Sequence, residues 1–239
     1  MSDPFQIRSA EPLFADIARN MHSIQRAAQE RPKIEERERD DARTRILKTA
    51  LKQFAMKGFH GVSTTEIAKD SAVTQPLIHY HFKTKEALWK AAVEQAFSWL
   101  KEDLSGLLKK PELRQRALFV AFVKTLVAFA AKHPEVGQFL LREGMQKDSE
   151  RLTWMTEQLL QPAFDILSVY YQQGVGEGWL QPLPFAQLSV MLTAMSTHFF
   201  AVAPMINQLY GVDAQDPEQI TKLTDLVVQF VEKVIIKAA

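Results

Sequence analysis

Cysteine is absent from the 239 residues of this chain. Its absence excludes disulfide frameworks, thiol nucleophiles, iron–sulfur clusters and every zinc site that needs a cysteine ligand. Glycine is scarce, with 9 residues, and runs of alternating β-branched residues are almost missing. We therefore expect an all-α fold, in a chain that suits a reducing cytoplasm.

Long apolar runs are also missing. The most apolar stretch, residues 117–131, contains Lys124 and is shorter than the roughly 20 residues that a membrane span needs. Residues 1–10 include Asp3 and Arg8 and have no apolar core of the kind that signal peptides carry. The sequence predicts neither export nor a membrane partner, and we expect a cytoplasmic protein.

The motifs of common enzyme classes do not occur. The sequence contains no G-x-S-x-G, H-E-x-x-H, P-loop or dinucleotide-binding glycine run. His79 and His81 are two residues apart, so they point to different faces of a helix, and no nearby carboxylate completes a metal site. We expect no enzyme activity, no cofactor and no metal.

Positive charge is concentrated in one segment. The formal net charge is +1, but residues 42–90 hold 9 Lys and Arg against 3 Asp and Glu. The flanking segments, residues 1–41 and 91–239, have balances of 7 against 9 and 13 against 16. A basic segment in a nearly neutral chain is the electrostatic pattern expected of phosphate binding.

Residues 42–90 contain signals for several short helices. An apolar stripe from Ile46 to Phe54 ends at Lys57 and Gly58, as helices that stop at a glycine do. The run Ser63 to Glu66 has the spacing of a capping box and starts a helix to about Ser71. Thr74 is expected to cap a helix over residues 75–82 with Pro76 in its first turn, and Thr84 to cap a long helix beyond it.

The rest of the chain also has a helical pattern. Residues 12–29 are amphipathic, and residues 33–45 are almost all charged, which is typical of a solvated helix or a mobile arm serving as a linker. Helix 12–29 is open to three interpretations: packing against a second copy of the chain or against its later helices, an arm that follows DNA and includes residues 31–45, or membrane-surface binding. Five further helices are expected near residues 113–132, 135–147, 150–174, 184–209 and 217–237.

Two short helices joined by a tight turn are typical of the helix-turn-helix motif. The run GVSTTEIAKDSAVTQPLIHYHFKTKEAL, residues 61–88, resembles the tetracycline-repressor (TetR) family of bacterial transcription regulators. The resemblance covers residues 42–90, about a fifth of the chain. It implies an N-terminal extension over residues 1–41, a three-helix DNA-binding domain over residues 42–90, and a larger helical ligand-binding and dimerisation domain over residues 91–239.

The resemblance also implies which residues contact DNA. Thr64 and Thr65 are expected to hold a phosphate, Lys85 to bind the backbone, and the helix over residues 75–82 to read bases in the major groove. The complete predicted set is Arg43, Arg45, Thr64, Thr65, Thr74, Gln75, Pro76, Leu77, His79, Tyr80, His81 and Lys85. The sequence departs from the family pattern at Ala72 and Pro76, where glycine is most common, and at His79, where tyrosine is usual.

Two further sites are predicted in residues 91–239. Several aromatic and histidine side chains either belong to the core or line a ligand cavity: Phe122, Phe139, Trp154, Tyr170 and His198. For His198, a place in the core is the first interpretation. The last two long helices are apolar on more than one face, which predicts a four-helix dimer interface. The residues expected there are Leu188, Met191, Met195, Phe199, Leu223, Val227, Phe230 and Val234.

These features together predict a transcriptional regulator. We expect a homodimeric repressor that binds a palindromic operator in double-stranded DNA and leaves it when a small molecule binds. The alternatives are an all-helical small-molecule carrier and a DNA-binding protein without sequence preference.

Overall fold

The structure is a computed structural model that describes residues 34–109, 115–147 and 149–237. The predicted helix over residues 12–29 lies outside the described residues. The chain divides into two compact units, residues 1–43 and 44–239. The described part of the first unit, residues 34–43, is helical. The second unit contains the rest of the fold, and the paragraphs below concern it.

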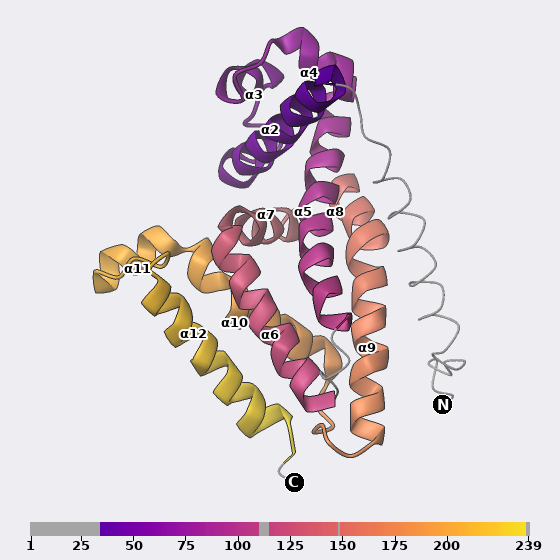
Figure 1. Cartoon of the computed structure of the whole chain (residues 1–239), viewed down its shortest axis with the longest axis vertical. Coiled ribbons are helices and arrows are strands. Elements are labelled where there is room, and N and C mark those ends of the chain that lie inside the picture. The colour runs from indigo at the N-terminus through magenta and orange to yellow at the C-terminus, as the bar shows by residue number, and fades with distance from the viewer. Residues whose placement is uncertain (1–33, 110–114, 148, 238–239) are drawn as a thin grey trace. The chain divides into compact units, whose positions relative to one another are not determined.

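Helices make up the regular structure of the described residues, so the all-α expectation is confirmed (Figure 1). Their only β feature there is an isolated bridge between Leu180 and Ile236. The helices are α2 (Ile34–Lys57), α3 (Thr64–Asp70), α4 (Gln75–Phe82), α5 (Lys85–Leu108), α6 (Gln115–Lys132), α7 (Pro134–Gly144), α8 (Glu150–Met155), α9 (Gln161–Gly176), α10 (Phe185–Ala201), α11 (Ala203–Tyr210) and α12 (Pro217–Phe230), with two π-helical turns, η1 (Thr156–Leu160) and η2 (Val231–Ile235).

One hydrophobic core joins the short N-terminal helices to the middle of the chain. Phe54 of α2 and Ile67 of α3 are fully buried, as is Trp89 of α5. The Trp89 ring contacts Phe139 of α7 and Trp154 of α8, with ring centroids 5.4 and 5.8 Å apart. This core therefore holds α7 and α8 against the helices that carry the basic segment.

A second core fills the C-terminal part. Val123 and Val127 of α6 are fully buried among Leu192 and Phe200 of α10 and Val231 of η2. Apolar residues recur at three- and four-residue intervals on α6, so one face of the helix can meet α10 while another meets α12. Because α6 contributes to this core and touches α5 as well, it links the two cores.

The predicted helix over residues 184–209 is wrong as a single element. The chain bends by 69° between α10 and α11, at Val202. Pro204 follows the bend, and a proline removes one helical hydrogen bond and its ring clashes with the carbonyl four residues earlier. Helix 150–174 is likewise not regular throughout: it passes through the π-turn η1 just before Pro162.

The described part of the charged segment, residues 34–45, forms helix rather than a separate linker. Of the two alternatives, helix or mobile arm, the structure has the helix, because α2 starts at Ile34 and runs on without a break to Lys57. The helix predicted at residues 46–57 is thus the second half of a longer one.

No single helix in the described ranges is long and apolar enough to cross a membrane, although α6 with α7 and α10 with α11 meet that test as bent pairs.

Candidate nucleic-acid interface

The end of α2 is fixed by its own glycine and by an arginine from α7. Gly58 follows the helix with φ +75°, a left-handed conformation that favours glycine. The guanidinium of Arg142 donates hydrogen bonds to the carbonyl oxygens of Ala55, at 2.9 Å, and Met56, at 2.8 Å. Carbonyls at a helix C-terminus lack partners within the helix, so a side chain from α7 satisfies the last turn of α2.

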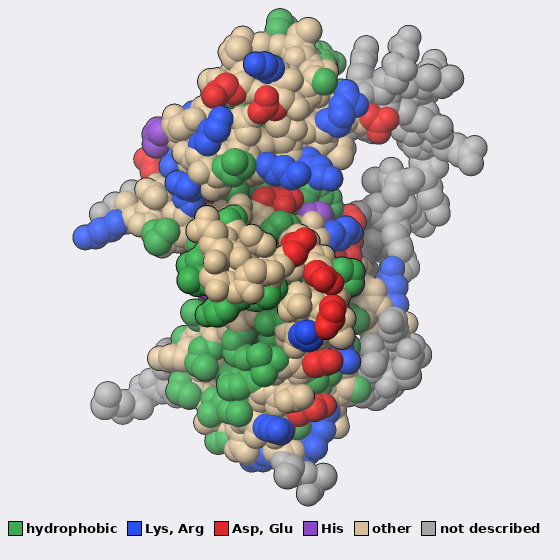
Figure 2. Space-filling model, turned by 90° about the vertical axis from the view of Figure 1, so that its left-hand side faces the viewer, with side chains coloured by type: hydrophobic (Ala, Val, Ile, Leu, Met, Phe, Trp, Pro, Cys, Tyr) green, Lys and Arg blue, Asp and Glu red, His purple; other side chains and the backbone are tan. Residues whose placement is uncertain are grey.

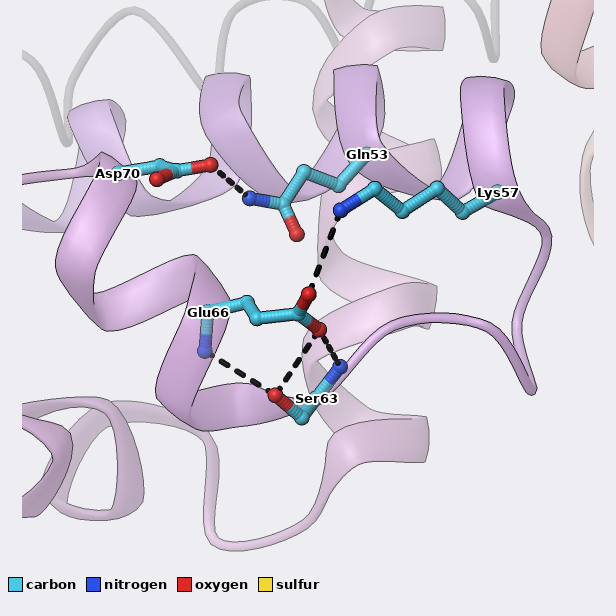
Figure 3. A network of polar contacts seen from close by, with 5 residues as sticks. All are labelled: Gln53, Lys57, Ser63, Glu66 and Asp70. Atoms are coloured by element: carbon cyan, nitrogen blue, oxygen red, sulfur yellow. Dashed lines mark hydrogen bonds and ion pairs between the residues drawn. The ribbon is translucent and has the colours of Figure 1, made fainter.

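A capping box begins α3, as the sequence predicts (Figure 3). The backbone N–H of Glu66 donates to the Ser63 hydroxyl at 3.1 Å, and the Ser63 N–H donates to the Glu66 carboxylate at 2.9 Å. Lys57 of α2 lies 3.3 Å from the same carboxylate. The hydrogen bond from the Ser63 backbone, more than any other contact, lowers the pKa of Glu66, whose side chain is about half exposed.

The other end of α3 is also joined to α2. The buried side chain of Gln53 donates a hydrogen bond to the carboxylate of Asp70 (Figure 3). The Lys57–Glu66 and Gln53–Asp70 contacts hold both ends of α3 to the same face of α2. The position of α3 is therefore fixed by polar contacts as well as by burial of Ile67 and Ala68.

The turn from α3 to α4 requires a left-handed residue. Ala72 has φ +54°, and the N–H of Val73 donates to the carbonyl of Ala68 at 3.0 Å. The resemblance places the family's common glycine here, and the structure shows why glycine suits the site. Thr74 is the N-cap residue of α4, but its hydroxyl makes no capping hydrogen bond, contrary to the sequence prediction.

Helix α4 has one buried face and one exposed face. Ile78 and Phe82 are buried in the first core. The exposed side chains share the opposite face at three- and four-residue intervals; they are Gln75, Pro76, His79 and Tyr80, with Tyr80 61% exposed. The structure places Leu77 and His81 half-buried beside that face, whereas Arg43 and Arg45 are exposed on α2.

Gln75 links α4 to the start of α3. Its amide oxygen accepts a hydrogen bond from the Thr65 hydroxyl at 3.2 Å, and its amide nitrogen lies 3.5 Å from the Thr64 hydroxyl. The residues predicted to hold a phosphate and the residue predicted to read a base are therefore in contact. Spacing along the chain does not reveal this contact, because the residues are ten and eleven positions apart.

Lys85 lies at the start of α5, after Thr84 caps the helix as predicted. Its ammonium is 4.5 Å from the centre of the Phe59 ring, and the guanidinium of Arg151 lies 4.1 Å from the same centre. Burial, followed by repulsion from Arg151, lowers the pKa of Lys85. Sequence patterns indicate Lys85 but neither Phe59 nor Arg151, since Arg151 is 66 positions away and carries no motif.

Arg151 is itself held by Glu143 of α7. The ion pair is 3.5 Å long, and Glu143 is buried. Burial raises the pKa of Glu143, and the charge of Arg151 opposes that shift. The corner between α7 and α8 thus contacts the helix-turn-helix segment twice, through Arg142 on α2 and through Arg151 on Phe59.

The residues predicted for a dimer interface are not all exposed. Leu188 and Val227 are 5% and 1% exposed and belong to the second core of the protomer itself. Met195, Phe199, Leu223 and Phe230 are half-buried against that core, and Met191 and Val234 are exposed. The most exposed apolar residues on α10 and α12 are instead Val190 and Leu226, at 66% and 62%. Figure 2 shows hydrophobic side chains gathered on the face that carries α11 and α12.

The residues predicted for a ligand cavity fall into separate places. Phe139 and Trp154 pack around Trp89 in the first core, whereas Phe122 and Tyr170 pack against the second. The Tyr170 hydroxyl donates to the carbonyl of Gln115 at 2.9 Å, and burial, with a smaller contribution from Glu177, raises its pKa to about 12. His198 is exposed on α10, so its interpretation as a core residue is wrong.

Two family models match the sequence, one over the N-terminal helices and one over the C-terminal helices. A model described as "Bacterial regulatory proteins, tetR family" matches residues 46–92, and "Tetracyclin repressor-like, C-terminal domain" matches residues 117–231. The chain is 27% identical over 206 residues to the uncharacterized HTH-type transcriptional regulator YerO of Bacillus subtilis strain 168, covering 79% of this chain but 65% of YerO, which is less than two thirds. It is 25% identical over 178 residues to the HTH-type transcriptional regulator RutR of Escherichia coli strain K12, covering 72% and 79% of the two chains.

Solved structures show the same fold. A putative transcriptional regulator from Saccharomonospora viridis, crystallised in complex with choline, superposes with a TM-score of 0.57 at 16% identity, covering 83% of this chain and all of that one. The short helices α3 and α4 lie inside the match to the first family model, and helices α6 to α12 lie inside or overlap the match to the second. This combination defines a helix-turn-helix transcriptional regulator. The chain belongs to the TetR family.

Proposed function

We propose that the protein is a homodimeric repressor that binds a palindromic operator and is released from it by a small molecule. The observation that carries the proposal is the exposed face of α4, which consists of Gln75, Pro76, His79 and Tyr80. Helix α4 packs against α3, which begins with a capping box. A helix with a polar, aromatic and exposed face, supported from behind by Ile78 and Phe82, is suited to enter a major groove.

The contacts divide into phosphate and base contacts. Thr64, Thr65 and Lys85 bind phosphates, with Arg43, Arg45 and Thr74 adding charge and hydroxyl contacts at the sides. Gln75, His79 and Tyr80 read base edges. Pro76, Leu77 and His81 shape the edge of this surface by van der Waals contact, because two of the three are half-buried.

The cluster of Gln75 with Thr64 and Thr65 supports a particular order of events. Without DNA, both threonine hydroxyls hold the Gln75 amide. A phosphate that takes the threonine hydroxyls frees the amide to pair with a base, since each group then exchanges one partner for another. Base reading by Gln75 is in this way coupled to correct phosphate placement.

Two copies are proposed to pair through the exposed apolar faces of α10, α12 and the following turn η2. Val190, Met191, Leu226 and Val234 form the centre of this dimer face, and the half-buried Met195, Phe199, Leu223 and Phe230 lie below it. His198 joins the dimer face because it is exposed on the same side of α10 as Met191 and Ala194, at three- and four-residue intervals. Leu188 and Val227 are left out because they are buried within the protomer.

Release follows from the geometry of a symmetric dimer. The two copies of α4 must meet half-sites roughly 34–36 Å apart. A ligand that favours a different separation of the two helices lowers operator affinity, typically by ~1–3 kcal/mol of coupling free energy. The choline complex of the S. viridis regulator supports a small-molecule site in this fold. We place the site against the second core, near Phe122 and Tyr170, rather than around the filled contacts of Phe139 and Trp154.

The test is selection of random DNA duplexes with the purified protein, followed by sequencing. We expect a palindrome whose half-sites lie about one helical turn apart. Gln75→Ala is expected to change the recovered motif, whereas Lys85→Ala should recover the same motif with weaker binding and a salt slope reduced by about one unit. Recovery of no motif by the wild-type protein would contradict the proposal in favour of binding without sequence preference.

A further inference from the structure

A cleft of about 250 Å³ lies where α2 meets α5 and the corner between α6 and α7. Two of its lining residues come from α2, three from α5, and two from that corner. They are Thr44, Lys48, Trp99, Glu102, Asp103, Lys132 and His133. The cleft is partly open to solvent, and neither Phe122 nor Tyr170, near which the small-molecule site is placed, is among its lining residues.

An aromatic pair forms the rigid wall of the cleft. The ring of His133 stacks on that of Trp99, with centroids 4.7 Å apart and planes at 17°. His133 is 8% exposed, and its Nδ1 has no hydrogen-bond partner among the described residues. The nearest carboxylate oxygen, from Glu135, is 3.6 Å from Nδ1, longer than a hydrogen bond. A buried ring nitrogen whose only polar neighbour is beyond hydrogen-bond length is unusual, and the ring lines the cleft.

Charges of both signs surround this wall without pairing. Lys48 and Lys132 contribute two ammonium groups, and Glu102 and Asp103 two carboxylates. None of the ion pairs found among the described residues involves these four side chains. The one side-chain hydrogen bond they make within those residues is from the Ser98 hydroxyl to Glu102, at 3.4 Å. The cations lie on α2 and at the end of α6, the anions on α5, and the cleft lies between them.

We propose that this cleft binds a small zwitterion of amino-acid size. A carboxylate of the ligand would pair with Lys48 and Lys132, and its ammonium with Glu102 and Asp103 beside the Trp99 ring. The volume equals that of about eight water molecules, so it accepts a molecule of about that many non-hydrogen atoms. A ligand with a single charge would satisfy one pair of side chains and leave the other pair without a partner.

Occupation of the cleft has a mechanical consequence that rests on the proposed repressor function. Lys48 belongs to the helix that supports α3 and α4, whereas Lys132 and His133 belong to the regulatory helices. A zwitterion that contacts both sets favours the conformer in which their distance fits the ligand. Operator affinity then changes according to the difference between the zwitterion's affinities for the two conformers.

The binding step is tested by titration calorimetry of the full chain without DNA. The probes are glycine, 4-aminobutanoate, 6-aminohexanoate and L-lysine, with hexanoate and hexylamine as analogues that each keep one charge. We expect one site per chain for at least one zwitterion, and binding at least about tenfold weaker for both single-charge analogues. Failure of every zwitterion to bind more tightly than the analogues overturns the proposal.

Variants locate the site. Lys48→Ala and Asp103→Ala are each expected to weaken zwitterion binding about tenfold or more, because each removes a partner for one ligand charge. Lys101→Ala and Lys124→Ala are matched controls, since both lysines are exposed on α5 and α6 and neither lines the cleft. Equal affinity in the cleft variants and the controls would show that the zwitterion binds elsewhere.

A second arm tests the regulatory consequence. Operator affinity is measured with the best zwitterion at saturation, and we expect a change of about fivefold or more in the wild type and none in Asp103→Ala. Unchanged wild-type affinity would overturn the regulatory part of the proposal. Failure to select any operator would count against the proposed function alone, because the calorimetry uses no DNA.

Discussion

At the scale of single residues, the helix-turn-helix depends on a few backbone positions. Gly58 and Ala72 both have positive φ, at +75° and +54°, and only the first is a glycine. Alanine in the left-handed region carries a steric cost of roughly 1–2 kcal/mol, because its Cβ approaches the following carbonyl. The turn before α4 therefore contains local strain at an exposed residue.

Ala72→Gly is expected to stabilise the protein. Relief of the strain outweighs the greater flexibility of glycine in the unfolded chain, which costs about 0.4–1 kcal/mol, so the net gain is about 0.5–1 kcal/mol. Urea unfolding measures the change. Ala128→Gly, at an exposed position in the middle of α6, is the matched control and should destabilise by about 1 kcal/mol. A loss of stability in Ala72→Gly would contradict the assigned conformation.

Glu66 gives the capping box a pH dependence. Its pKa is lowered below the ordinary value of 4.5 in the folded protein, so its contribution to stability is complete above pH 4.5. That contribution is lost as the pH falls through the folded pKa, because the protonated carboxyl no longer accepts from Ser63 as an anion or pairs with Lys57.

The comparison with Glu66→Gln isolates this effect. The variant should be less stable than the wild type at pH 7, and the difference should shrink as the pH is lowered from 5 toward 3, since glutamine does not titrate. Urea unfolding across this range measures it. Glu157→Gln is the control, because none of the interactions found in the described residues involves the Glu157 side chain. A constant difference between wild type and Glu66→Gln would show that the carboxylate does not act through its charge.

At the scale of elements, the joint between α7 and α2 is the feature that sequence patterns did not indicate. In the structure, Arg142 binds two carbonyls at the end of α2, and Glu143 pairs with Arg151 of α8. Helix α7 of the C-terminal part thus completes the hydrogen bonding of α2, which supports α3 and α4.

Arg142→Ala is expected to destabilise the protein by about 2 kcal/mol, because two charge-assisted hydrogen bonds to otherwise unpaired carbonyls are lost. Thermal or urea unfolding measures the loss, and operator affinity should fall as α2 becomes less fixed. Arg142→Lys keeps the charge but not the planar fork, so it should recover only part of the stability. Stability within about 0.5 kcal/mol of the wild type in Arg142→Ala would show that the joint is not important.

At the scale of the whole molecule, the exposed apolar residues of α10, α12 and the following turn η2 are the feature to be explained. Val190, Met191, Leu226 and Val234 are 44–66% exposed, beside the buried Val227. A monomeric protein seldom leaves such residues together on one surface, and apolar contiguity of this kind marks an interface. Homodimerisation through the dimer face is the explanation we propose.

Leu226→Glu is expected to produce monomers and to abolish tight operator binding, because a charge buried in the dimer face has no partner and a single recognition helix meets one half-site. Analytical ultracentrifugation measures the first effect and operator titration the second. Met145→Glu is the matched control: Met145 is 75% exposed, but it lies beyond α7 and outside the dimer face. Dimers that persist in Leu226→Glu would place the interface elsewhere.

The sequence by itself determined the helix-turn-helix segment, because local chemistry specifies it. The Ser63 and Glu66 capping box, the Pro76 first turn and the stop at Gly58 each depend on residues a few positions apart, so each can be recognised from the order of residues alone. Only the tertiary structure decided which apolar side chains face inward. Val227 and Leu226 are adjacent, equally apolar and both on α12, yet one is 1% and the other 62% exposed. Periodicity could not separate them, since both lie on the apolar stripe of α12 and only its packing against α6 selects the buried side. The same reason explains Arg142, Phe59 and Arg151, whose contacts join residues far apart in the chain and leave no local pattern in the sequence.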